Sequence, residues 1–160
     1  MKTTYSWKVK TLSPPNRKLV KKLLEKAAAL SGLDTAKDWV ANLMFVGDKT
    51  MAGINRDFLR HEGTTDVITF SYFDDGDVEP GDTGVELVVC GDVACREGAA
   101  RQDSSYAEEM TLYIVHGFLH ASGEDDLDPV SRKRMRRREK EVMAVLRREF
   151  PLEEIFPSSR

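Results

Sequence analysis

Two histidines in the second half of the chain have the spacing of a shared metal site. His116 and His120 are four residues apart, so on a helix their side chains lie one turn apart on the same face. Gly123 can end that helix in a backbone conformation that other residues resist, and the turn can bring Asp126 back toward both rings. Two imidazoles and a carboxylate, with a fourth position open to water, are typical of a catalytic zinc site. The sequence therefore predicts one Zn²⁺ ion bound by His116, His120 and Asp126.

The segment around the pair supports this interpretation. Residues 110–121 (MTLYIVHGFLHA) are apolar nearly all round, which indicates a buried helix. Histidines in such a helix need partners, because burying an unpartnered polar group is costly in free energy. A shared metal is one solution, and hydrogen bonds to buried carbonyls are the other. The full pattern of two histidines, a glycine and an acid favours the metal.

The residue after the first histidine bears on the kind of hydrolysis. Metal-dependent proteases carry H-E-x-x-H, in which the glutamate takes a proton from the metal-bound water. Gly117 stands at that position here, and glycine has no proton acceptor. The pattern disfavours peptide hydrolysis and favours another hydrolysis by metal-activated water. It leaves the general base unassigned, since Glu124 and Asp125 are more typical of surface turn residues.

Composition predicts one globular domain over residues 1–160, long enough to bury a core. No apolar run approaches the roughly 20 residues that span a bilayer. The first ten residues (MKTTYSWKVK) lack the apolar segment of a signal peptide, so we expect a cytoplasmic protein without membrane association. Cys90 and Cys95 are too few for a disulfide framework or a Cys-rich zinc site, and we expect both to be buried free thiols.

Hydrophobic periodicity predicts strands interleaved with helices. The expected strands are residues 5–9, 39–46, 65–73 and 85–90. The first expected helix begins at residues 13–16 and ends at Gly32. Four more are expected at 48–58, 93–101 and 106–121, and from residue 129 onward. This order predicts an α+β fold: a single domain with a mixed four-stranded sheet, covered by helices around the buried metal-binding helix.

Four other polar or aromatic residues are expected to be structural. Asp66 lies at the start of the strand at 65–73 and is expected to cap a turn. His61 lies in a polar loop and is expected to be exposed, and Trp7 and Trp39 are expected in the core.

The charge is unevenly distributed along the chain, although the net charge is only −3. All charged side chains of residues 74–86 (DDGDVEPGDTGVE) are acidic, whereas residues 129–148 are strongly basic. Such asymmetry can steer a phosphate backbone to one face of a protein. A solvated helix face is the alternative, and composition alone favours it.

Two segments resemble the motifs of a known family, the YbeY endoribonucleases, which are ribosomal RNA maturation factors. Residues 116–126 (HGFLHASGEDD) are similar to its H-G-x-L-H-x-x-G-Y-D-H motif, and residues 65–70 (TDVITF) to its T-D-V-L-S-F strand. The final helix, with Met135 and Glu139, also resembles the C-terminal helix of that family. The similarity extends from the second strand to the last helix, in one order and with matching spacing.

The resemblance implies a zinc-dependent, single-strand-specific endoribonuclease. It also implies a role in 3′-end maturation of small-subunit ribosomal RNA and in ribosome quality control. The partners would be ribosomal RNA and the small ribosomal subunit, with no DNA expected. With an RNA substrate, Arg134, Arg137 and Arg138 of the basic segment become candidate substrate-binding residues.

The chain departs from the family pattern around the site. Asp126 stands where the family usually has its third histidine, so we expect the site to persist with altered affinity and less Lewis acidity. Glu124 replaces a common tyrosine. Leu59 occupies the position where the family often has an arginine, and Arg60 follows it. We assign Arg60 as the catalytic cation that balances transition-state charge, with Arg56 as the alternative and loss of the role also open.

Three functions remain open from the sequence. The first is the zinc endoribonuclease, with either water or the 2′-hydroxyl of RNA as the nucleophile. The second is a non-catalytic ribosome-assembly or RNA-binding factor stabilised by its metal. The third is a metalloprotease, which Gly117 disfavours.

Overall fold

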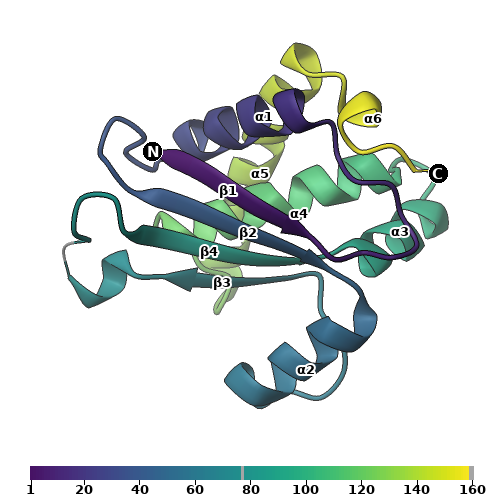
Figure 1. Ribbon diagram of the computed structural model, residues 1–160, viewed down its shortest axis with the longest axis horizontal. Coiled ribbons are helices and arrows are strands. Elements are labelled where there is room, and N and C mark those ends of the chain that lie inside the picture. The colour runs from purple at the N-terminus through teal and green to yellow at the C-terminus, as the bar shows by residue number, and fades with distance from the viewer. Residues whose placement is uncertain (77, 159–160) are drawn as a thin grey trace.

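Four strands form one sheet in the computed structural model, which describes residues 1–76 and 78–158. They are β1 (Lys2–Trp7), β2 (Val40–Val46), β3 (Val67–Ser71) and β4 (Thr83–Cys90). Their order across the sheet is β1-β2-β4-β3 (Figure 1). β2 runs parallel to β1 and β4, while β3 runs antiparallel to β4. The predicted mixed four-stranded sheet is confirmed.

Helices connect and cover these strands. The longer ones are α1 (Arg17–Leu30), α2 (Asp48–Leu59), α3 (Gly91–Ala100), α4 (Tyr106–Ala121) and α5 (Pro129–Glu149). Two short turns, η1 (Phe73–Asp75) and α6 (Leu152–Ile155), were not predicted. In Figure 1, α1, α4 and α5 lie behind the sheet, and α2 lies apart from them below β3. The α+β single-domain prediction is therefore confirmed.

Side-chain caps explain where three of the helices begin. Asn16 accepts a hydrogen bond from the backbone N–H of Leu19 before α1, and Ser105 accepts one from Glu108 before α4. Asp128 likewise precedes the proline that starts α5. Each cap satisfies one of the N–H groups that have no partner within the helix.

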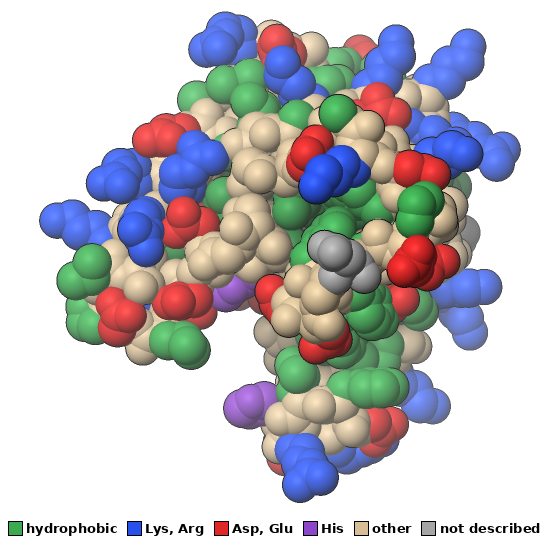
Figure 2. Space-filling model, turned by 90° about the vertical axis from the view of Figure 1, so that its left-hand side faces the viewer, with side chains coloured by type: hydrophobic (Ala, Val, Ile, Leu, Met, Phe, Trp, Pro, Cys, Tyr) green, Lys and Arg blue, Asp and Glu red, His purple; other side chains and the backbone are tan. Residues whose placement is uncertain are grey.

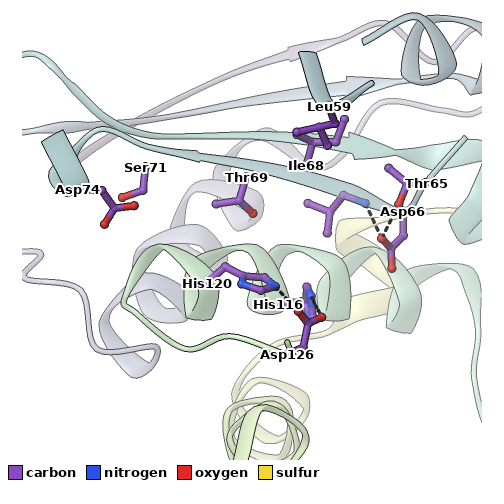
Figure 3. A pocket seen from close by; sticks show the side chains of 11 residues that line it. Leu59, Thr65, Asp66, Ile68, Thr69, Ser71, Asp74, His116, His120 and Asp126 are labelled. Carbon is purple, nitrogen blue, oxygen red and sulfur yellow. Dashed lines mark hydrogen bonds and ion pairs between the residues drawn. The ribbon is translucent and has the colours of Figure 1, made fainter. Parts of the chain in front are cut away.

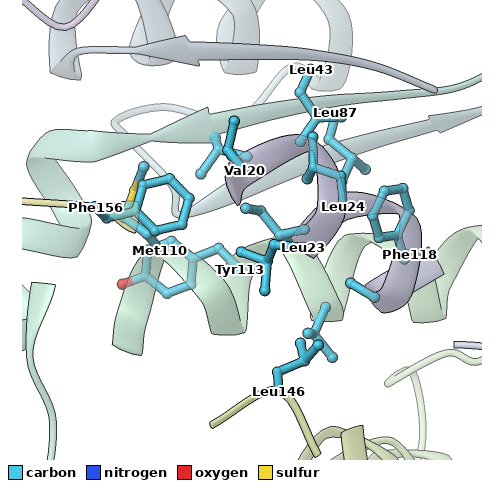
Figure 4. Packing of buried hydrophobic residues seen from close by; sticks show 14 of the residues in the cluster. Val20, Leu23, Leu24, Leu43, Leu87, Met110, Tyr113, Phe118, Leu146 and Phe156 are labelled. Carbon is cyan, nitrogen blue, oxygen red and sulfur yellow. The ribbon is translucent and has the colours of Figure 1, made fainter. Parts of the chain in front are cut away.

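The apolar helix α4 lies at the centre of the packing, as its sequence predicts. Its Phe118 packs among Leu23 and Leu24 of α1 and Leu87 of β4, all fully buried (Figure 4). Because most side chains of α4 are buried, moving the helix would expose apolar surface to water, and this cost holds the helix in place. The histidines at its C-terminal end are thus carried by a rigid element.

Several predicted boundaries and environments need correction. β1 covers Lys2–Trp7 and not residues 5–9. It begins earlier than expected because its polar first residues pair with β2, from Lys2 opposite Val40 onward. β3 is shorter than residues 65–73, because the chain bends at Asp66 just before the strand, where the Asp66 carboxylate accepts a 2.7 Å hydrogen bond from the N–H of Val67. Cys95 is exposed, so the prediction of two buried thiols holds only for Cys90.

Of the remaining structural predictions, Trp39 is buried, but Trp7 is only partly so. His61 is exposed, as expected. Within the described residues, no helix is both long enough and apolar enough to cross a membrane.

Gly117 allows α4 to pack closely against the sheet. A Cβ atom at this position would lie 2.7 Å from Cδ2 of Leu87 and 3.3 Å from Oγ1 of Thr69. We expect Gly117→Ala to lower the free energy of unfolding by about 1–3 kcal/mol, because overpacking displaces neighbours in a dense core. Urea unfolding followed by circular dichroism measures this change.

Gly53→Ala on α2 is the matched control for this substitution. A Cβ atom there would have only the Arg56 guanidinium nearby, at 3.9 Å. The higher helix propensity of alanine should then raise stability by about 0.5–1 kcal/mol. A neutral or stabilising Gly117→Ala would contradict the packing role of this glycine.

Candidate metal centre

Three side chains converge at the C-terminal end of α4. The rings of His116 and His120 have centroids 4.6 Å apart. Asp126, in the following turn, places Oδ2 3.9 Å from Nε2 of His116 and Oδ1 3.8 Å from Nε2 of His120. One ligand atom from each residue lies within 4.8 Å of the others (Figure 3). The structure thus brings together the three residues that the sequence pattern grouped.

The turn after α4 explains how Asp126 returns to the histidines. Gly123 has a φ of +112°, a conformation that strains any residue with a side chain. Its N–H donates to the carbonyl of His120, and the N–H of Glu124 donates to the carbonyl of Leu119, both at 3.0 Å. This pair of bonds is the Schellman motif that closes helices at a glycine. The chain reverses there, and Asp126 faces the helix that it has just left.

Glu139 of α5 contacts the site from a second helix, a role that the sequence analysis did not assign. Its Oε1 lies 2.6 Å from Nδ1 of His116, and its side chain is only 17% exposed. A carboxylate accepts hydrogen bonds, so the geometry places the proton of His116 on Nδ1. Nε2, the atom nearest Asp126, then keeps its lone pair for a metal. The donor set of two imidazoles and a carboxylate therefore fits a metal ion.

The surroundings of His116 also shift its affinity for protons. Burial has the largest single effect and lowers its pKa, but the hydrogen bond and charge of Glu139, together with the charges of Asp66 and Asp126, outweigh burial. The net result is a pKa above the ordinary value of 6.5 in the metal-free protein. Metal binding at Nε2 must displace the second proton of the protonated imidazole, so metal affinity should rise with pH.

We expect the stability of the metal-free protein to fall as the pH rises. Because the folded pKa of His116 is raised, its pairing with Glu139 stabilises the fold fully below pH 6.5. That contribution is lost as the pH rises through the folded pKa. The test is the Tm of EDTA-treated protein between about pH 5 and pH 9. The Tm of the parent protein should exceed that of Glu139→Gln at low pH, and this difference should shrink as the pH rises. A difference in Tm that is constant across this range would contradict the assignment.

The three residues line one end of a groove of about 440 Å³ between β3 and α4. Thr69, Ser71 and Asp74 line the side that β3 and the following turn provide, and Leu59 at the end of α2 lines the groove further along (Figure 3). The side chains of His116, His120 and Asp126 are 25%, 28% and 44% exposed, and the molecule is hollowed on the face that Figure 2 shows. The site is therefore open to solvent and to an extended ligand.

Arg60 lies at the end of α2, outside this groove. It ends the helix in a left-handed conformation with a φ of 56°, and its side chain is exposed. Leu59, its neighbour, lines the groove instead. Among the described residues that line the groove, none is Lys or Arg. The catalytic role of Arg60 stays a prediction.

The three candidate RNA-binding arginines on α5 differ in their contacts. Arg134 donates to Glu124 at 3.1 Å, which places it beside the turn that carries Asp126. Arg138 donates to Glu141 and to the carbonyl of Leu30, both at 2.7 Å, and so ties α5 to α1. Arg137 is exposed, without an ion pair to any described residue. Arg134 and Arg137 are thus exposed, whereas Arg138 is partly buried, and the substrate-binding role of all three stays a prediction.

Fold and cluster together define a single-domain α+β protein with a candidate metal site of the open, three-ligand kind. The sequence model of the family described as Endoribonuclease YbeY matches residues 3–147. The chain belongs to this family.

Curated relatives support the assignment. Endoribonuclease YbeY of Rhodopirellula baltica is 38% identical over 127 residues, which cover 79% of this chain but 62% of that protein. The protein of the same name from Halalkalibacterium halodurans is 31% identical over 144 residues, covering 84% and 89% of the two chains. The solution structure of TM1509 from Thermotoga maritima shares the fold, with a TM-score of 0.53 and 21% identity over 98% of this chain and all of that one.

Proposed function

We propose that this protein is a zinc-dependent endoribonuclease that cleaves single-stranded RNA. One observation carries the proposal: His116, His120 and Asp126 converge at the end of an open groove, and Glu139 holds His116 in the tautomer that leaves Nε2 free. Its relatives are named endoribonucleases, which makes a phosphodiester the bond to test. Gly117 stands where metal-dependent proteases have the glutamate that peptide hydrolysis needs.

Each residue of the site has a definite task in this mechanism. A bound Zn²⁺ supplies Lewis acidity and activates water near neutral pH. His116, His120 and Asp126 would hold it, and Glu139 keeps the proton on Nδ1 of His116. Arg60 is proposed as the cation that approaches the scissile phosphate once RNA lies beside Leu59.

We further propose a biological setting from the family. The substrate would be small-subunit ribosomal RNA, near its 3′ end, in the cytoplasm, with a part in ribosome quality control. Arg134 and Arg137, which line one groove at the start of α5, would contact the RNA backbone.

A non-catalytic RNA-binding factor is the second candidate. The absence of Lys and Arg from the groove lining, among the described residues, favours it, because a phosphoryl transition state needs positive charge nearby. In that case the metal would only stabilise the fold.

Metal analysis and RNA cleavage together test the proposal. Protein purified without a nickel column should contain about one equivalent of zinc. It should cleave a single-stranded RNA oligonucleotide, spare a duplex and casein, lose activity in EDTA and regain it with added Zn²⁺. A 2′,3′-cyclic phosphate on the product would identify the 2′-hydroxyl as the nucleophile. If zinc-loaded protein cleaves no RNA, the nuclease proposal is wrong and the non-catalytic RNA-binding function is favoured.

A further inference from the structure

The first 30 residues form a strongly basic segment in an acidic protein. They carry eight Lys or Arg residues and one acid, Glu25, for a formal charge of +7. The rest of the chain has 16 basic and 26 acidic residues, for a charge of −10. Among the described residues, only Lys26 of the eight has a carboxylate partner, Glu149 at 3.7 Å. The other seven are exposed: Lys2, Lys8, Lys10, Arg17, Lys18, Lys21 and Lys22.

A groove of about 560 Å³ lies within this segment, between β1 and the start of α1. Tyr5 and Trp7 of β1 and Pro15 provide its apolar surface, and Arg17 and Lys21 of α1 provide its cations. The two aromatic side chains are partly exposed. The groove therefore combines flat apolar surface with positive charge.

The aromatic rings are held in place from behind. Their centroids lie 6.1 Å (Tyr5) and 5.2 Å (Trp7) from that of Phe45, which is fully buried. The indole N–H of Trp7 donates to the carbonyl of Leu12 at 3.3 Å. Rings fixed in this way can receive a ligand with little loss of conformational entropy.

The charges at the start of α1 are not explained by folding. Arg17 and Lys18 are in its first turn, which contains no acid. The helix dipole favours acids there, so two cations at this end oppose the stability of the helix. Residues that break such a local rule are often retained for function. Here the partial positive charge of the helix end adds to the charges of Arg17 and Lys21, which line the groove, and together they favour an anion there.

This groove is distinct from the metal centre. β1 and β3 are the opposite edge strands of the sheet, and the metal groove follows β3 (Figure 1). The two grooves share no lining residue.

We infer that the β1–α1 groove is a second binding site for single-stranded RNA. Bases would stack on Tyr5 and Trp7, while Arg17 and Lys21 contact phosphates, the combination that binds single strands without sequence preference. An acidic protein segment would use the cations but would have no need of the paired aromatic rings. The inference rests on the proposed function, since it concerns RNA that extends beyond the cleaved bond.

Trp7 provides a direct test, because the chain has two tryptophans and the other, Trp39, is buried. In a Trp39→Phe background, Trp7 fluorescence should be quenched saturably by an oligouridine of about 20 nucleotides. EDTA-treated protein is used, so that no cleavage occurs. Stacking on the indole is the physical cause of the expected quenching.

Charge reversal in the same background completes the experiment. Arg17→Glu with Lys21→Glu should weaken RNA binding at least tenfold and abolish the quenching. The slope of log K against log salt should fall in magnitude by about 1.4, or 0.7 for each lost phosphate contact. The control, Lys37→Glu with Arg148→Glu, makes the same charge change at exposed residues outside the groove and should bind nearly as the parent does. Circular dichroism confirms that both variants are folded.

Two results would overturn the inference. One is an unchanged affinity and fluorescence response in the Arg17/Lys21 variant. The other is polyglutamate that quenches Trp7 as well as oligouridine does, which would make the site one for acidic protein. Because binding is measured without metal, it does not depend on catalysis. Failure of the nuclease proposal would instead appear as zinc-loaded protein that binds RNA and leaves it intact.

Discussion

Replacing His120 with alanine should remove the metal and, with it, RNA cleavage. The substitution leaves His116 and Asp126 as the only two ligands of the cluster, whereas catalytic zinc sites use three. We expect a loss of metal affinity well above the roughly 10–100-fold that follows loss of an outer-shell partner. Cleavage should fall by at least about the same factor, because the activated water is lost with the ion. Zinc content after dialysis and the rate of oligonucleotide cleavage measure the two effects.

A control must show that the loss of a histidine outside the cluster does not by itself remove the metal. His61 is exposed and does not line the groove, so His61→Ala should keep full zinc content and activity. Asp126→His should also keep the ion, because it supplies the donor that the family usually has, whereas Asp126→Ala should lose it. A His120→Ala protein that retained zinc at unchanged affinity would remove this cluster as the metal site.

The metal ligands could be predicted from sequence because their geometry is local. Helical periodicity fixes the relation between His116 and His120, and Gly123 fixes the reversal that returns Asp126. No packing between distant segments is needed for the three to meet. The same holds for α4, whose apolar surface required a central place in the fold.

Features that depend on how distant segments pack were harder to predict. Glu139 is 23 residues from His116 on another helix, so their contact depends on how α5 packs against α4. The apolar signal for β1 was strongest after Thr4, yet the strand begins at Lys2 because β2 offers partners there. The cations of residues 1–30 give a weaker signal in the sequence, because they are spread over 30 residues, whereas the charged runs at 74–86 and 129–148 are denser.

Glu139→Gln should lower metal affinity about 10–100-fold without removing a ligand. Glutamine has nearly the same shape but no charge, and its amide can donate as well as accept. The variant therefore no longer requires the proton of His116 to be on Nδ1, and the imidazole becomes a poorer donor at Nε2. Competition with a chromophoric zinc chelator gives the affinity, and the ring ¹⁵N shifts of His116 give the tautomer.

A neighbouring glutamate on the same helix separates this role from general effects of charge or helix stability. Glu141 is exposed and pairs with Arg138, so Glu141→Gln removes the same charge two residues away. It should leave both metal affinity and the His116 tautomer unchanged. Glu139→Asp keeps the charge on a shorter side chain and should restore part of the affinity. If Glu139→Gln bound zinc as tightly as Glu141→Gln does, the 2.6 Å contact would be structural only. The selection of the His116 tautomer would then have to come from the metal itself.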